Sequence, residues 1–261
     1  MDSGLDGDTA LVTASSSGLG RASAEAFVAE GANVTICGRD AERLAAAEAD
    51  LESAGPGGVL AVQADVTDPD DVDDLVAATV EEFGALDHLV TSAGGVPPGE
   101  FTDLTQRDWY QAYDTLVMSV VWTVSAARPH LVESETGTVT CITSRSVREV
   151  LDDLLLSNSV RRAVVGLVQT LAREFAPDVR VNAVLPGAHE TDRITELVEA
   201  GIESGDYEAY EAGLADWASD VPMGRIGDPE ELGDVVAFLA SDLASYVNGA
   251  SVAVDGGAMR C

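Results

Sequence analysis

Lysine is absent from this chain of 261 residues, and all 14 of its basic residues are arginine. Against them stand 46 Asp and Glu residues, which gives a formal net charge of -32 at pH 7. Such a charge repels phosphate backbones and anionic lipid headgroups, so it excludes nucleic-acid binding and membrane-surface roles. The expected partner is a small molecule.

Long apolar runs and paired cysteines are also missing. No segment approaches the roughly 18 apolar residues that span a bilayer, and the amino terminus, MDSGLDGDTALVTA, has no basic region. Cys37, Cys141 and Cys261 lie far apart, without a disulfide framework or the paired spacing of a zinc site. These absences predict a cytoplasmic protein with no metal centre.

The acidic composition without lysine resembles that of proteins adapted to molar salt, where the screening length falls to roughly 3 Å and self-repulsion is damped. An ordinary acidic enzyme is the alternative.

Strand-like and helix-like patterns alternate along the whole chain. Residues 138–143, TVTCIT, form a β-branched apolar run typical of a buried strand. From about Asp153 the period changes, because Val160, Val164, Leu167, Val168 and Leu171 recur three and four apart. Pro177 ends this helix, and a second apolar strand, VRVNAVL, follows. The pattern predicts an α/β fold in a single domain over residues 1–261, with helices on both faces of a parallel sheet.

The first strand, TALVTA, leads into a turn of small residues and an Ala-rich helix. In this arrangement backbone N–H groups and the helix dipole hold a pyrophosphate. The expected phosphate-binding residues are Thr13, Ser15, Ser16, Ser17, Gly18, Leu19 and Gly20. After the second strand, Gly38 stands where an acidic residue binds the ribose of NAD, and Arg39 follows it. A guanidinium suits a 2′-phosphate, so the sequence favours NADP over NAD.

These motifs resemble those of the short-chain dehydrogenase/reductase family, especially its branch similar to 3-oxoacyl-carrier-protein reductases. The similarity extends from Thr9 to Gly257 and implies a Rossmann-type doubly wound sheet of about seven strands. The family's Thr-Gly-x-x-x-Gly-x-Gly fingerprint is matched except at Ala14, which replaces the first glycine. The resemblance implies further cofactor contacts at Asp65, Val66, Ala93, Gly94, Pro186, Gly187 and Thr191.

By the same resemblance, three of the family's active-site residues are replaced in this chain. The family places a Tyr thirteen residues after the Ser of the reaction centre and a Lys four residues further on. Registered on Ser144, these positions hold Ser157 and Arg161, and the position of a family Asn holds Leu116. The expected catalytic set is therefore Ser144, Ser157 and Arg161, with Arg161 also binding the nicotinamide ribose.

Because the family's Tyr and Lys are replaced, the sequence does not identify the group that transfers the proton. His189, Arg145 and Arg148 are candidate substitutes near the crevice. The favoured function is an NADP-dependent oxidoreductase acting on a carbonyl or alcohol. The alternatives are a catalytically silent nucleotide-binding protein that acts as a sensor or assembly partner, and a halohydrin dehalogenase.

Two further segments have expected roles. Residues 192–223 are acidic and helix-like, and we expect them to form a lid over the substrate. Tyr207, Tyr210 and Trp217 either line a pocket or fasten this lid. The last strand, SVAVDGG, pairs subunits in relatives, so the resemblance implies a homotetramer or homodimer.

Overall fold

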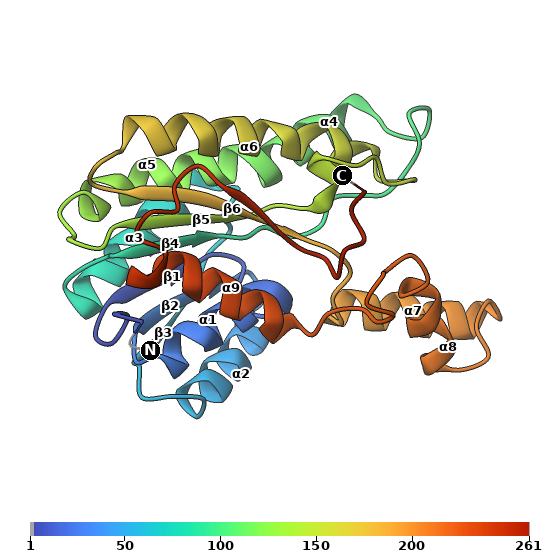
Figure 1. Cartoon of the computed structure of the whole chain (residues 1–261), viewed down its shortest axis with the longest axis horizontal. Coiled ribbons are helices and arrows are strands. Elements are labelled where there is room, and N and C mark those ends of the chain that lie inside the picture. Colours follow the sequence, from blue (N-terminus) through green and yellow to red (C-terminus); the bar gives the residue numbers. More distant parts are fainter. Residues whose placement is uncertain (1–2, 261) are drawn as a thin grey trace.

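The fold of this computed structural model, which describes residues 3–260, is built on one parallel sheet (Figure 1). Its strands are β1 (Thr9–Val12), β2 (Asn33–Gly38), β3 (Val59–Gln63), β4 (His88–Thr91), β5 (Thr138–Ile142), β6 (Arg180–Pro186) and β7 (Ser251–Val254). Their order is β3-β2-β1-β4-β5-β6-β7, and every pairing is parallel. The order reverses between β1 and β4. In doubly wound sheets the carboxyl ends of the strands at such a point form the ligand crevice.

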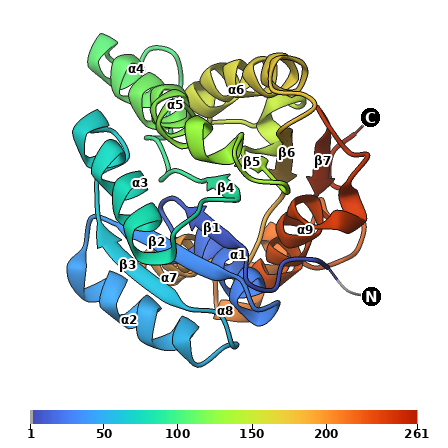
Figure 2. The ribbon, with the colours of Figure 1, turned by 90° about the vertical axis from the view of Figure 1, so that its left-hand side faces the viewer.

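Helices cover both faces of the sheet (Figure 2). They are α1 (Gly18–Ala29), α2 (Ala41–Glu52), α3 (Pro69–Phe83), α4 (Gln106–Tyr113), α5 (Ser119–Leu131), α6 (Leu155–Glu174), α7 (Asp192–Ser204), α8 (Tyr210–Trp217) and α9 (Pro229–Ala240). Apolar side chains of α1, α2 and α9 form one core, and those of α3, α5 and α6 form the other. The seven-stranded sheet and its two helical layers confirm the predicted fold class.

The helices begin where local chemistry favours them. Asp68 accepts from the backbone N–H of Asp70, and Pro69 occupies the first turn of α3, where its missing N–H costs nothing. Thr105 and Asp108 form a reciprocal capping box at the start of α4. These side chains fix where each crossover helix leaves its loop.

One predicted helix is interrupted. The sequence pattern predicts continuous helix from about Thr105 to His130, but a π-helical turn, Asp114–Met118, separates α4 from α5. Such turns leave one extra residue in the helix and occur often at functional sites. The turn holds the buried Leu116, the residue at the position of the family's Asn.

Residues 192–223, where the sequence predicts a lid, contain the helices α7 and α8, which project from one end of the molecule (Figure 1). Ile194 and Val198 of α7 form a small core with Ile226. The Tyr210 hydroxyl donates to Glu190, and the Tyr207 hydroxyl donates to Asp216. The two tyrosines therefore hold α7 and α8 in place, whereas Trp217 is partly exposed.

Candidate active site

The turn after β1 is tied to the neighbouring strand by hydroxyl groups. Thr13 Oγ1 donates to the carbonyl of Ser92 at 2.7 Å and accepts from its N–H at 2.8 Å. Ser15 is fully buried, and its Oγ donates to Val12 while its backbone N–H donates to Cys37. Thr13 and Ser15 thus shape the turn from inside, and neither presents a hydroxyl to the crevice, contrary to the expectation that both contact phosphate.

Ala14 has φ of 48°, in the left-handed region where the family uses glycine. Nearby, a Cβ on Gly20 would meet the Ala14 carbonyl oxygen at 2.7 Å, so helix α1 approaches this turn too closely for any side chain. The residue replacing the first glycine is therefore accommodated with backbone strain, and the turn keeps its tight form.

The amino end of α1 is suited to an anion. Ser17 is its N-cap but makes no side-chain capping bond, and the first turn contains no acidic residue. Exposed N–H groups and the positive end of the helix dipole favour a phosphate here. On the evidence of this cradle, the residues present fit a dinucleotide cofactor.

Helix α1 opens onto a crevice of about 340 Å³ at the carboxyl ends of β1, β4 and β5. Its lining residues are Ala14, Ser17, Gly18, Leu19, Gly20, Ser92, Ala93, Gly94, Gly95, Val96, Ile142, Thr143, Leu154, Ser157, Arg161, Thr191, Asp192 and Arg193. The loops after β1, β4 and β5 and the starts of three helices, α1, α6 and α7, therefore meet in one cavity. Two of the three expected catalytic residues line it.

Ser157 is buried on α6, and its Oγ lies 3.1 Å from Ser146 Oγ. Ser144 caps the short 3₁₀ turn Arg145–Val147, where its Oγ accepts from the N–H of Ser146 at 3.1 Å. Ser144 is not among the residues lining the crevice. Ser157 therefore pairs with Ser146, whereas Ser144, which the sequence places in the expected catalytic set, is held by the backbone of its own turn.

Arg161 lies one turn further along α6. Its Nη1 donates to the Thr143 carbonyl at 3.2 Å, while its Nε is buried without a partner among the described residues. Burial, with a smaller contribution from nearby Arg193, lowers the pKa of Arg161 to about 10. The group remains a cation at neutral pH, and it has no ion-pair partner within residues 3–260.

Some of the other expected cofactor residues line the crevice, and others lie outside its lining. Thr191 lines it, makes no capping bond, and lies 3.5 Å from where a Cβ on Gly18 would be. Arg39 is exposed at the end of β2, and Asp65 accepts from Thr67. Gly187 packs against Asp255. Expected contacts outside the cavity lining are Thr13, Ser15, Ser16, Arg39, Asp65, Val66, Pro186 and Gly187.

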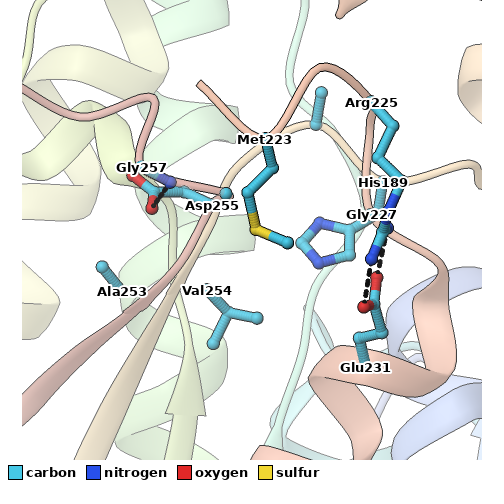
Figure 3. Close-up of a pocket in the computed structure, with 11 residues that line it drawn as sticks. His189, Met223, Arg225, Gly227, Glu231, Ala253, Val254, Asp255 and Gly257 are labelled. Carbon is cyan, nitrogen blue, oxygen red and sulfur yellow. Dashed lines mark hydrogen bonds and ion pairs between the residues drawn. The ribbon is translucent and has the colours of Figure 1, made fainter. Parts of the chain in front are cut away.

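The three substitute residues do not line the crevice. Arg145 pairs with Glu149 at 3.9 Å, and Arg148 donates to the Ser251 carbonyl. His189 lies in a separate cavity of about 310 Å³, facing Met223 and Gly227 near the Arg225–Glu231 ion pair (Figure 3). Burial there lowers the pKa of His189.

Two residues of the site were missed by the sequence analysis. Ser146 follows Ser144 by two residues, and a serine in a polar loop gives no signal of its position. Arg193 begins α7, and its guanidinium lies against Gly95 on the opposite wall. The only available signal was its place two residues after Thr191 at the start of the expected lid.

The remaining reactive groups belong to the core. His88 is buried between Thr138 Oγ1 and Asp8 Oδ2, at 2.8 and 3.0 Å, as expected of a core histidine. Burial raises the pKa of Cys37 to about 12 and that of Cys141 to about 11, so neither thiol is a nucleophile. Cys261 lies outside the described residues. Within residues 3–260 we find no cluster of three metal-ligating side chains and no helix long and apolar enough to cross a membrane.

Comparison with known proteins identifies the family. Residues 13–259 match the family model described as enoyl-(acyl carrier protein) reductase. L-rhamnose 1-dehydrogenase (NAD(P)(+)) of Azotobacter vinelandii is 36% identical over 255 residues, covering 95% of each chain.

Two solved structures are similar over nearly their full length. L-sorbose reductase of Gluconobacter frateurii, complexed with NADPH and L-sorbose, is 30% identical with a TM-score of 0.95, covering 100% of both chains. The NADPH-bound short-chain oxidoreductase of Pseudomonas aeruginosa PAO1, described as containing an atypical catalytic center, is 32% identical with a TM-score of 0.88, covering 97% of each chain. The chain belongs to the short-chain dehydrogenase/reductase family of NAD(P)-dependent oxidoreductases.

Proposed function

We propose that this protein is an NADPH-dependent reductase, or the reverse dehydrogenase, of a small polyhydroxylated carbonyl or alcohol compound. The observation that carries the proposal is the intact cradle at the start of α1, which opens directly onto the Ser157–Arg161 face of α6. Two of the similar proteins act on sugars, L-rhamnose and L-sorbose, which supports a substrate of that class.

The preference for NADPH rests on the end of β2. Gly38 leaves no carboxylate at the position that binds a ribose 2′-hydroxyl, and a Cβ there would meet Ser16 Oγ at 2.8 Å. The neighbouring Asp40 is occupied as the N-cap of α2. Arg39 is exposed beside it and makes no ion pair among the described residues, so its guanidinium is free for a 2′-phosphate.

A bound nicotinamide nucleotide supplies the hydride. The protein's task is then to bind the carbonyl oxygen and to stabilise its developing negative charge. When Ser146 donates to Ser157, the Ser157 O–H remains free to donate into the crevice. Arg161 adds a fixed positive charge nearby.

Neither group is a good proton donor at neutral pH, because a serine hydroxyl is a weaker acid than tyrosine and Arg161 holds its proton. A water that reaches Ser157 through the open side of the crevice therefore supplies the proton. We expect slow turnover, since positioned acid–base groups usually contribute about 10²–10⁴-fold.

Restoring the family's groups tests this mechanism. The double variant Ser157→Tyr with Arg161→Lys should raise kcat for NADPH-dependent carbonyl reduction by about 10²-fold or more, because the phenol regains a matched pKa. The readout is NADPH absorbance over a panel of sugars and small ketones, with NADPH and NADH affinities measured by calorimetry in high salt. NADPH binding without turnover by wild type or variant would favour a silent nucleotide sensor.

The other expectations remain proposals. We infer one domain over residues 1–261 with a substrate lid at 192–223. Exposed Phe238, Leu243 and Tyr246 lie beside the last strand, β7, which supports assembly into a homodimer or homotetramer through this edge. A cytoplasmic location and adaptation to molar salt follow from the composition alone.

A further inference from the structure

The crevice is a cationic site in a strongly acidic protein. Its lining includes two arginines, Arg161 and Arg193, and one acid, Asp192. The Asp192 carboxylate is already paired with Arg43 outside the crevice, at 3.2 Å. The net charge of the chain is -32, so two arginines without carboxylate partners in one cavity need an explanation.

The two guanidinium groups face the same space. Arg193 reaches from the start of α7 to Gly95, at the loop after β4. Arg161 reaches from α6 to the Thr143 carbonyl, at the end of β5, and its Nε is buried without a partner among the described residues. The two cations are close enough that Arg193 disfavours the charge on Arg161. An oxyanion between them would satisfy both.

A dinucleotide pyrophosphate does not account for Arg161. It belongs at the amino end of α1, which follows β1. The end of β5 lies two strands away, across β4, and adjacent strands are about 4.8 Å apart, so the separation is roughly 10 Å. Arg161 therefore stands on the Ser157 side of the crevice, where the substrate binds. Arg193 lies against Gly95, after the intervening strand β4.

We propose that the substrate carries a carboxylate, held between Arg161 and Arg193 while its carbonyl or hydroxyl group meets Ser157. This inference rests on the proposed function and adds the substrate class: oxo acids, hydroxy acids or sugar acids in place of neutral sugars. The planar fork of a guanidinium matches a carboxylate in two hydrogen bonds. Val96, Ile142 and Leu154 provide the apolar part of the cavity wall.

The test compares matched pairs of substrates with NADPH and the full chain. The pairs are glyoxylate against glycolaldehyde, acetoacetate against its methyl ester, and glyceraldehyde 3-phosphate against glyceraldehyde. We expect kcat/KM to favour the carboxylates by about 10- to 100-fold over the neutral partners, since hydrogen bonds between charged groups are strong. A preference for the phosphate ester alone would move the assignment from carboxylate to phosphate.

The variant Arg193→Gln should lower kcat/KM for glyoxylate about 10- to 100-fold, mainly through KM, and should lower kcat/KM for glycolaldehyde by a much smaller factor. The matched control is Arg162→Gln, because Arg162 is the exposed neighbour of Arg161 on the same helix. Control and wild type should behave alike. Equal use of charged and neutral partners, unaffected by Arg193→Gln, would overturn the inference and leave the proposed function standing.

A binding assay decides the inference even without turnover. Oxamate should raise the Tm of the wild-type protein, with or without NADPH, and its neutral analogue oxamide should not. Arg193→Gln should abolish the shift. Oxamate stabilisation without turnover of any substrate would retain the anion site and refute the reductase. If oxamate and oxamide are equivalent, the anion site is wrong.

Discussion

Arg161→Met should stabilise the protein although it removes a group of the reaction centre. The folded protein holds the pKa of Arg161 at about 10, well below its ordinary value, mainly because the guanidinium is buried. A depressed pKa of a base means that folding opposes the charged form, so the charge costs stability throughout the neutral range. At about 1.4 kcal/mol for each pKa unit, the cost is about 3 kcal/mol.

The substitution also loses one favourable contact. Arg161 Nη1 donates to the Thr143 carbonyl, and a hydrogen bond of this kind contributes about 1 kcal/mol. The net gain in the free energy of unfolding is therefore about 2 kcal/mol, which in a chain of this size raises Tm by about 4–8 °C. Methionine fills the space without introducing a polar group.

Thermal unfolding in molar KCl measures this gain, since salt screens the change in net charge. Arg162→Met is the matched control, because it removes the same charge from an exposed site and should change the free energy of unfolding by less than about 0.5 kcal/mol. The advantage of Arg161→Met should shrink as pH rises above 10, where native Arg161 releases its proton and the unfolded chain does not. A Tm below that of wild type would refute the reasoning.

Two further predictions concern the core and the phosphate turn. Ala14→Gly should raise the free energy of unfolding by about 0.5–1 kcal/mol, because φ of 48° strains alanine and not glycine; urea denaturation checks this, and a loss of stability contradicts it. The free energy of unfolding should also fall above pH 9. The unfolded chain then releases thiol protons that folded Cys37 and Cys141 retain up to about pH 12 and 11. Each thiol lowers the free energy of unfolding by up to about 1.4 kcal/mol per pH unit. Replacing both cysteines with alanine should flatten the alkaline limb of the denaturation curve, and an unchanged slope would assign it to other groups.

The sequence predicted the sheet and its layers because strand and helix periods are local signals. The run TVTCIT is fully buried as β5, and the apolar positions Val160, Val164 and Val168 of α6 face the core as their spacing predicts. The π-helical turn at Leu116 was not predictable, because a single inserted residue leaves the hydrophobic period on each side intact.

The sequence predicted which residues of a single helix face the crevice. It did not predict which residues from different segments contact one another. Ser157 and Arg161 are four apart on α6 and both line the crevice, as helical spacing requires. The contact between Ser157 and Ser146 was not predicted, because a 3₁₀ turn directs Ser144 to its own backbone and brings Ser146 inward. The sequence analysis also placed His189 near the crevice, but the residue lies in the other cavity. Its backbone forms a β-bridge with Gly227 there.

The charge distribution sets the conditions under which a nucleotide can bind. A chain of net charge -32 repels NADPH at low ionic strength, where the screening length reaches about 30 Å and the whole surface acts on the ligand. In molar salt that length is about 3 Å, so the ligand experiences mainly the groups that it touches. Those groups are the uncapped start of α1 and the arginines of the crevice, all of which favour an anion. Salt therefore removes the long-range repulsion while the contacts in the crevice remain, and the acidic surface and the cationic crevice are compatible in one protein.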